Sequence, residues 1–456
     1  MNLMNKTDSA ADAAVIPVAP SGLPFLGHAL RMHSDPLSFF ESLRDHGDVV
    51  QIKLGPRRVY VLNSVEAIRS VLVTEQSHFY KGDHISVARA LIRDGLISAE
   101  GGTHRRQRRL MQPAFRRERI AEYAEIMQEQ ILERTATWRP GDTVDIRIEM
   151  ATLTIAVAAK SLISAEPGKD LVDFIVHTMP RVFDLMYQRM VTPLSLLNKL
   201  PLPRNREWAA SVARLHSMVD EVIADYRGGC ISRNDLLSML LEAEDGESGD
   251  TLSDYEVHDQ VTAILVAGSE TTATTLTWIF YTLSRHPHIE ARLFAEVDEV
   301  LNGRAAEYAD LRQLPYTAQV VTEALRYYTP AWILTRSAIE DVDLVDYRIP
   351  AGSSVMFSPY VVHRDPRLFQ DPNTFDPDRW SPERVADIPR GAVLQFGTGP
   401  RKCIGEVFAV VEATLALATI AARWRLRAQP GATIDAVART THTPRSLLMT
   451  LEKRTD

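Results

Sequence analysis

The feature that most constrains the fold is one long helical pattern, DYEVHDQVTAILVAGSETTATTLTWIFYTLSRHP. Ser253 precedes it as a suitable N-cap, and Pro287 follows it at a point where a helix has to end. Apolar residues surround this helix almost completely, which predicts that it lies in the interior of a large protein. A chain of 456 residues is long enough to bury it.

Helical periodicity also dominates from about residue 116 to residue 300, whereas the β-rich runs are short. Residues 49–54 and 58–62 predict a hairpin, and the segment DYRIPAGSSVMFSPY around Pro350 to Gly352 predicts a second one. No repeat, low-complexity tract or linker divides the chain. The sequence therefore predicts a mainly α protein with a helix-rich core and a small β-sheet region. We expect a single domain over residues 19–456, after a flexible N-terminal tail over residues 1–18.

Charge and cysteine content exclude several classes of protein. The net charge of -8 argues against nucleic acid as a partner. Two cysteines, Cys230 and Cys403, are too few for a disulfide framework, a four-cysteine zinc site or a protein-held iron–sulfur cluster. The chain shows no secretory signal and no apolar run of about 20 residues, so we expect a cytoplasmic protein without a membrane span.

Cys403 lies in the segment FGTGPRKCIG, which is rich in glycine and directly precedes an apolar helical pattern. A lone cysteine is often packed as a small hydrophobic residue. Here, however, Phe396, Gly399, Arg401 and Gly405 surround it in the pattern F-x-x-G-x-R-x-C-x-G. Glycines let the backbone approach a flat group closely, and the start of a helix stabilises a thiolate. The pattern favours a metal ligand or a nucleophile.

This segment resembles the haem-binding loop of the cytochrome P450 family, the haem-thiolate monooxygenases. The resemblance extends from about Pro20 to the segment THTPRSLLMTLE near the end of the chain. It implies the cytochrome P450 fold, with haem b (iron protoporphyrin IX) as cofactor and Cys403 as the ligand to the iron. It further implies that Phe396, Gly399, Arg401 and Gly405 belong to the cofactor site.

A second motif, AGSETT at residues 267–272, lies in the middle of the long helix. Gly268 costs about 1 kcal/mol relative to alanine there, and buried polar side chains are costly unless they are hydrogen-bonded. The resemblance implies that Glu270 and Thr271 are the catalytic acid–alcohol pair that supplies protons during oxygen activation. The alternative is that the hydroxyls bond back to helix carbonyls and Glu270 forms a structural ion pair.

The segment HRRQRRLMQPAF, residues 104–115, is strongly basic. Such a segment is often a solvated face or a surface for an anionic partner. The resemblance implies that His104 and Arg108 contact the haem propionates, and that Arg336 in WILTRSA occupies another propionate-contacting position.

Glu323 and Arg326 in EALR, together with Arg379 in FDPDRW, resemble the family's structural Glu–Arg–Arg triad. Such a pair means little alone, because exposed pairs at this spacing stabilise a protein weakly. Three charges in a core must satisfy one another, which bidentate pairing of arginine with a carboxylate achieves. The expected role is structural.

The resemblance implies an oxidoreductase that inserts one atom of O2 into a C–H bond of a compact hydrophobic small molecule, by hydroxylation or successive oxidation. The haem domain accounts for the chain, so ferredoxin and its NAD(P)H-dependent ferredoxin reductase are the implied electron donors. The segments LRDHGDVVQIKLGP and HRRQRRLMQPAF are similar to bacterial members that oxidise terpenes. A polyketide or a fatty acid remains an alternative substrate.

Two other functions stay open at this point. One is a peroxide-driven peroxygenase, although the resemblance implies that such members tend to lack the acid–alcohol pair. The other is a non-catalytic haem protein that senses or stores a ligand, for which Glu270 and Thr271 would have no use.

Largely apolar residues line the substrate pocket that the resemblance implies, and core packing is the alternative for each of them. They are Phe79, Ile85, Val87, Leu91, Phe183, Met186, Ile264, Ala267, Trp332, Ile333 and Leu334.

Overall fold

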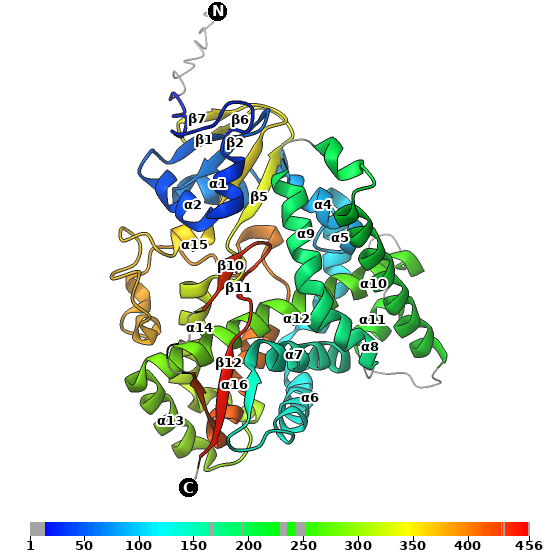
Figure 1. Cartoon of the computed structure of the whole chain (residues 1–456), viewed down its shortest axis with the longest axis vertical. Helices are drawn as coiled ribbons and strands as arrows, with labels where there is room; N and C mark the ends of the chain where they lie inside the picture. The colour runs from blue at the N-terminus through cyan, green and yellow to red at the C-terminus, as the bar shows by residue number, and fades with distance from the viewer. Residues whose placement is uncertain are drawn as a thin grey trace, which may run out of the picture.

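The computed structural model describes residues 14–163, 168–192, 195–228, 235–242, 251–429, 431 and 434–454 (Figure 1). Cys230 and residues 1–13 of the expected tail lie outside this part of the chain. Within the tail's last residues, Val18 forms an isolated parallel bridge with Gln51, whose backbone N–H donates to the carbonyl of Pro17 at 2.8 Å. The boundary between tail and domain at residue 18 stays a prediction.

The chain is mainly helical, as predicted. The α-helices are α1 (Ala29–Ser34), α2 (Pro36–Arg44), α3 (Val65–Arg69), α4 (Asp83–Ile92), α5 (Gly101–Met111), α6 (Arg117–Thr135), α7 (Ile146–Ile163), α8 (Lys169–Asp173), α9 (Met179–Val191), α10 (Pro203–Gly228), α11 (Leu236–Glu242), α12 (Asp254–Arg285), α13 (Pro287–Leu301), α14 (Pro315–Tyr328), α15 (Pro359–Val362) and α16 (Glu406–Arg423). Short 3₁₀ and π turns are η1 (Ser70–Thr74), η2 (Gln76–His78), η3 (Gln112–Phe115), η4 (Phe174–Thr178), η5 (Ser195–Lys199), η6 (Tyr308–Gln313), η7 (Pro377–Trp380), η8 (Val385–Asp387) and η9 (Gly399–Arg401).

The strands form small sheets. They are β1 (Val49–Leu54), β2 (Arg57–Leu62), β3 (Phe79–Tyr80), β4 (Thr143–Asp145), β5 (Leu334–Ala338), β6 (Val342–Leu344), β7 (Tyr347–Ile349), β8 (Ser354–Phe357), β9 (Trp424–Ala428), β10 (Ala436–Ala438), β11 (His442–Pro444) and β12 (Leu448–Lys453). One sheet has the order β1-β2-β8-β5-β3, a second has the order β4-β12-β9, and β6-β7 and β10-β11 are two-stranded.

The first predicted hairpin is confirmed, because β1 pairs antiparallel with β2. The second is wrong in its pairing. Both strands form, but β7 pairs with β6, whereas β8 lies between β2, in parallel, and β5. Every residue of β8 is buried, so this strand belongs in the middle of a sheet, while β7 is partly exposed.

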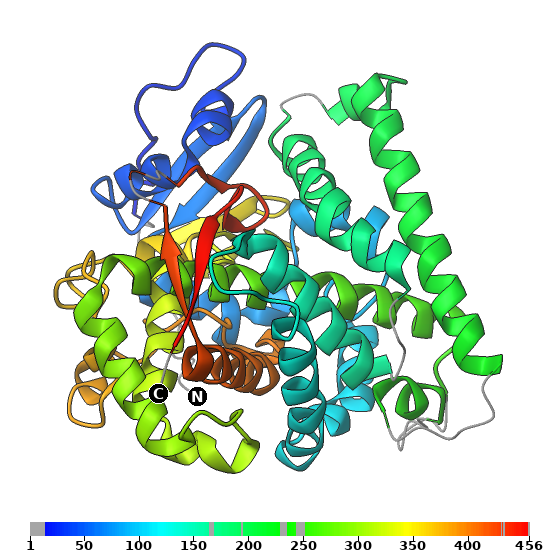
Figure 2. The same cartoon turned by 60° about the horizontal axis from the view of Figure 1, so that its bottom comes forward.

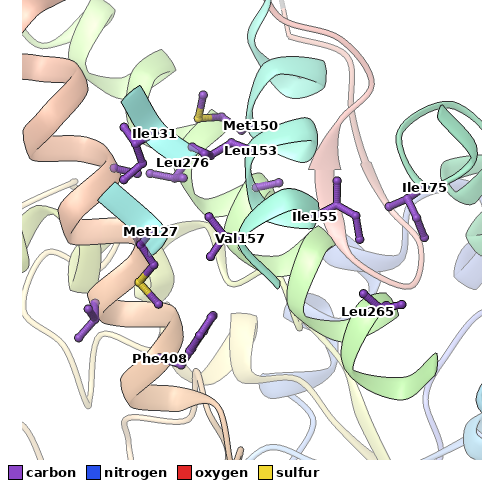
Figure 3. Close-up of a cluster of buried hydrophobic side chains, with 14 of the residues drawn as sticks. Met127, Ile131, Met150, Leu153, Ile155, Val157, Ile175, Leu265, Leu276 and Phe408 are labelled. Atoms are coloured by element: carbon purple, nitrogen blue, oxygen red, sulfur yellow. The ribbon is translucent and has the colours of Figure 1, made fainter. Parts of the chain in front are cut away.

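The long helix α12 has the predicted limits. Ser253 accepts a hydrogen bond from the backbone of Glu256 in a capping box, and the helix ends before Pro287. α12 packs against α7, α14 and α16 in the largest hydrophobic core, part of which Figure 3 shows. Figure 2 shows α16, in orange, beside the cyan α6, which completes this layer of packed helices. α16 directly follows the cysteine segment in the chain, so this segment lies at the edge of the core.

The expected triad residues lie together in the core. Arg326 on α14 makes a bidentate pair with Glu323, and the Nε atom of Arg379 lies 3.6 Å from Oε1 of Glu323. Arg379 also donates to the backbone carbonyl of Gln370 at 2.6 Å. Trp380 donates its indole N–H to Glu323 at 2.9 Å. The cluster thereby ties α14 to the irregular segment before η7.

Candidate active site

The cysteine segment is fixed by a backbone approach that only glycine permits. Gly399 has φ +74°, and a Cβ atom there would lie 2.2 Å from the carbonyl oxygen of Leu72 in η1. The backbone N–H of Cys403 donates to the carbonyl of Phe396 at 2.9 Å, which closes the loop. α16 begins at Glu406 with Gly405 as its N-cap residue. These contacts set the direction of the Cys403 side chain.

Cys403 lies deep in the protein but is not covered by it. Burial raises the pKa of the Cys403 thiol, while a backbone hydrogen bond from Gly405 and the charges of Arg108 and Lys81 act in the opposite direction. The residue nevertheless keeps an exposed surface. Both observations hold if the sulfur faces a space that the chain encloses and does not fill. A metal ion bound there would deprotonate the thiol outright.

A stripe of α12 is uncovered in the same way. Ile264, Ala267, Gly268 and Thr271 are half-buried, as is Glu270, whereas the other residues of α12 from Val261 to Thr272 are buried. Their spacing of three and four residues places them on one helix face. The hydroxyl of Thr271 donates to the carbonyl of Ala267 at 3.0 Å, the back-bonding that the structural alternative expected. Thr271 thus lies on an uncovered face with its proton engaged by the helix.

Glu270 projects from a different face of α12, since neighbouring helix residues lie about 100° apart. Burial raises the pKa of Glu270 to about 7, and a hydrogen bond from Thr441 together with the charge of Arg147 partly offsets this. Oγ1 of Thr441 lies 2.6 Å from Oε1 of Glu270. The structure therefore places the two residues of the acid–alcohol motif side by side in sequence but on separate helix faces.

Cations gather beside the cysteine segment. Lys81, Arg336 and Arg401 influence one another electrostatically, with Glu100 as the carboxylate among them. Arg401 pairs with Glu100, while Arg336 donates to the backbone carbonyl of Thr335 at 2.7 Å. Burial and the neighbouring cations lower the pKa of Lys81 to about 7 and that of Arg336 to about 10, and Glu100 partly offsets this. The cluster carries surplus positive charge that an anionic group would offset.

His104 and Arg108 have different surroundings, although one helix turn separates them on α5. His104 is buried, and burial together with the charges of Arg401 and Lys81 lowers its pKa to about 4. Arg108 donates to the carbonyl of Lys402 at 2.7 Å, next to the cysteine. His104 thus lies beside the cation cluster as a neutral imidazole at neutral pH, and Arg108 holds the backbone of the cysteine segment.

The expected pocket residues fall into several groups. Phe79, Leu91, Met186, Ile333 and Trp332 are buried in hydrophobic clusters, and Trp332 also donates its indole N–H to the carbonyl of Arg439 at 2.7 Å. Ile85, Val87 and Leu334 are half-buried. Phe183 lines a cavity with Glu270, whereas Ile264 and Ala267 belong to the uncovered stripe of α12. Their contact with a substrate stays a prediction.

Three residues of this region were not predicted. Lys81 and Glu100 belong to the cation cluster, and Thr441 contacts Glu270 from the hairpin of β10 and β11. None stands in a recognisable motif, because each is brought to the site by segments distant in sequence. The one available signal for Lys81 was its position two residues after Phe79, which was predicted to line the substrate pocket.

The family model described as Cytochrome P450 matches residues 17–454, and the chain therefore belongs to the cytochrome P450 family. It is 48% identical over 418 residues to cyclooctatin synthase of Streptomyces melanosporofaciens, covering 91% of each chain. It is 43% identical to cyclooctat-9-en-7-ol 5-monooxygenase of the same organism, covering 91% of this chain and 90% of the other. It is 42% identical to pentalenene oxygenase of Streptomyces avermitilis, covering 96% and 97%.

A solved structure supports the same fold. The crystal structure of the cytochrome P450DA heme domain superposes with a TM-score of 0.87 at 27% identity, covering 97% of this chain and 98% of that one. Among the described residues, no helix is both long and apolar enough to cross a membrane.

The protein is thus an oxidoreductase of the monooxygenase class, which uses haem b, O2 and electrons derived from NAD(P)H. The residues present fit this cofactor. An uncovered cysteine sulfur can bind the iron, and the surplus cations of Lys81, Arg336 and Arg401 match the two propionates of haem b. The half-buried stripe of α12 offers a face without large polar groups.

Proposed function

We propose that this monooxygenase hydroxylates a compact terpenoid, with Cys403 as the iron ligand. The observation that carries the substrate class is the set of three relatives named for cyclooctatin, cyclooctat-9-en-7-ol and pentalenene, which are terpenoids. All three are at least 42% identical over nine-tenths or more of both chains. An apolar face of α12 suits such a molecule, because Ile264 and Ala267 offer it no charge.

Cys403, together with the cations around it, is proposed to hold the cofactor. When bound, haem b supplies the iron at which O2 is activated and one oxygen atom is transferred to the substrate. Cys403 donates its sulfur, and the Gly405 N–H and Arg108 stabilise the negative charge there. Lys81, His104, Arg108, Arg336 and Arg401 would anchor the propionates. Phe396, Gly399 and Gly405 would shape the loop against the ring.

Glu270 and Thr271 are proposed to supply protons. A carboxyl with a pKa of about 7 can both hold and release a proton near neutral pH, as a general acid has to. Thr271 lies on the uncovered face, and its hydroxyl can exchange the Ala267 carbonyl for a group that faces it from that side. Thr271 directly follows Glu270 in the chain, so we propose that a proton held by Glu270 on one face of α12 is passed on through Thr271 on the other.

The electron donor is proposed to be a ferredoxin with its reductase. Arg105, Arg109 and Arg116 are exposed around Pro400 of the cysteine segment, and they line a surface groove with His104 and Arg108. A basic surface this close to Cys403 would attract an acidic electron carrier and orient it. We further propose one haem domain over residues 19–456 after a short tail, and a cytoplasmic location, which two cysteines in 456 residues support.

The test is a substrate-induced change of the haem absorbance, screened over terpenes, fatty acids and macrolides. Terpenes should give saturable spectral changes and, with NADPH, ferredoxin and reductase, an oxidised product. Cys403→Ala should lose the thiolate-type carbonyl spectrum and the product, because only a thiolate supplies the required electron density. Binding of fatty acids or macrolides alone would reject the substrate class. Product with peroxide and none with the reductase system would reject the ferredoxin route.

A further inference from the structure

Three hydrogen bonds join one face of α12 to the hairpin of β10 and β11. Thr441 donates to Glu270 at 2.6 Å, and Thr274 and Thr443 join their hydroxyls at 3.2 Å one turn further along. One turn beyond that, the indole N–H of Trp278 donates to the carbonyl of His442 at 3.1 Å. In Figure 1 the hairpin lies beside α12. Residues four apart on the helix therefore meet three neighbouring residues of the hairpin, Thr441, Thr443 and His442.

A cavity of about 220 Å³ lies along this same face. Its α12 lining comprises Val266, Ser269, Glu270, Ala273 and Thr274. At 100° per residue, the centre of this lining lies roughly 140° around the helix from the stripe that contains Thr271. Glu270 consequently faces the cavity, on a different side of α12 from Thr271.

The cavity has both apolar and polar walls and reaches the surface. Exposed residues at its edge include His177, Pro180 and Arg445, while Glu270 lies at its buried end. The charged or titratable groups around it come from every neighbouring element: Arg147 from α7, His177 from η4, Asp184 from α9, and Arg439 and Arg445 from the hairpin. Buried Nε of Arg147 has no hydrogen-bond partner among the described residues, which indicates room for water there.

Within the described part of the chain, Thr441 donates the only hydrogen bond that the Glu270 carboxyl accepts. Arg147 lowers the pKa of Glu270 and Asp184 raises it, but both act through charge alone. A charge at a distance does not fix a rotamer, whereas a hydrogen bond at 2.6 Å does. The direction of the carboxyl thus depends on one hydroxyl group.

We propose that Thr441 is a positioning residue for Glu270, because the Thr441 hydroxyl holds the Glu270 carboxyl toward this cavity and away from the face of Thr271. This inference rests on the proposed role of Glu270 in proton supply. Thr441 keeps the acid facing a cavity that reaches the surface, from which a proton can return to it. It also links that acid to the tip of a hairpin, so a movement of the hairpin changes where the carboxyl points.

The alternative is that Thr441 only fastens the hairpin, as the matched contact between Thr443 and Thr274 does. Thr443→Val is therefore the control, because it removes a hydroxyl from the same hairpin and the same helix face without touching Glu270. Thr441→Val removes the hydroxyl at nearly constant volume, and Thr441→Ser keeps it. All four proteins, including the unsubstituted one, should bind haem equally.

The experiment is an infrared titration of the Glu270 carboxyl in the haem-loaded protein, identified as the band that Glu270→Gln lacks. Thr441→Val should raise the midpoint by about one to two pH units, because the ionised carboxyl loses its donor. Thr441→Ser should restore the original midpoint, and Thr443→Val should leave it unchanged. A midpoint that stays in place in Thr441→Val, or moves equally in Thr443→Val, would overturn the proposal.

A turnover measurement separates this inference from the proposed function. Product formed per NADPH consumed should fall in Thr441→Val and recover in Thr441→Ser. If Glu270→Gln leaves this ratio unchanged, the proton-supply role of Glu270 is rejected, and with it the consequence for turnover. The infrared midpoint still decides whether Thr441 positions the carboxyl.

Discussion

Arg326 and Glu323 form a bidentate ion pair with both side chains fully buried, at 2.8 Å from Nε to Oε2 and 2.7 Å from Nη2 to Oε1. Further donors of Arg326 are taken by the carbonyls of His363 and Pro372. We expect Arg326→Met to lower the free energy of unfolding by about 3–5 kcal/mol, because it leaves a buried carboxylate without its main partner. Urea unfolding of the haem-loaded protein measures this.

The control is Arg181→Gln, which breaks the exposed pair with Glu207. Solvent screens that pair, so the urea midpoint should barely move. Equal losses in the two variants would show that Glu323 and Arg326 contribute no more than a surface pair.

Lys81→Met should have opposite effects on the haem-loaded and the haem-free protein. It removes one of the cations proposed to face the propionates, so haem should transfer faster to apomyoglobin. In the haem-free protein it removes a buried positive charge beside Arg336 and Arg401, which should raise the free energy of unfolding. Lys169→Met, at an exposed lysine on α8, should change neither measurement.

The same substitution makes a prediction about pH. Folding lowers the pKa of Lys81 from 10.5 to about 7, so the charged form is disfavoured in the folded state. Below about pH 7 both folded and unfolded chains carry the proton, and the full cost is present. Between about pH 7 and 10.5 the cost disappears as pH rises. The stability difference between Lys81→Met and the unsubstituted haem-free protein should therefore shrink across this window. A difference that does not change with pH would contradict the prediction.

A feature of the fold or of the site could be predicted from the sequence where the residues that determine it lie close together in the chain. The limits of α12 follow from Ser253, Glu256 and Pro287, which act within one helix turn. The pairing of β8 could not be predicted in this way. Its partners β2 and β5 are distant in sequence, and the pairing is determined by how the strands are buried in the sheet. Lys81 was missed for the same reason. Its electrostatic partners are Glu100, which directly precedes α5, Arg336 in β5, and residues of the cysteine segment.

Thr271→Ala should leave haem binding intact and lower the product formed per NADPH consumed, with the missing electrons recovered as peroxide. The hydroxyl of Thr271 is on the uncovered face of α12, and alanine removes it without enlarging a side chain. Thr275→Ala is the matched control, since its hydroxyl also bonds back to the helix, at 2.8 Å from the carbonyl of Thr271, but the residue is buried. An unchanged ratio in Thr271→Ala would reject the relay.

Trp332 and Ile264 were both predicted as pocket residues, and the structure gives them different surroundings. Trp332 is fully buried against Phe40 and Tyr187, so Trp332→Ala should lower the free energy of unfolding by about 3–5 kcal/mol. Ile264 is half-buried on the uncovered stripe, so Ile264→Ala should cost less stability and shift the spectral dissociation constant for the substrate. Equal stability losses with unchanged substrate affinity in both variants would place Ile264 in the core.

α12 separates two spaces, because Glu270 borders the cavity beside the hairpin and the next residue, Thr271, lies on the uncovered stripe. Insertion of a single residue ahead of Ala267 would rotate every later position by about 100° relative to what precedes it. The Glu270 carboxyl would then no longer face Thr441, and Thr271 would no longer lie on the uncovered stripe. The residues of the motif would be unchanged. In this protein the spacing of the motif is therefore as much a part of the chemistry as the identity of its residues.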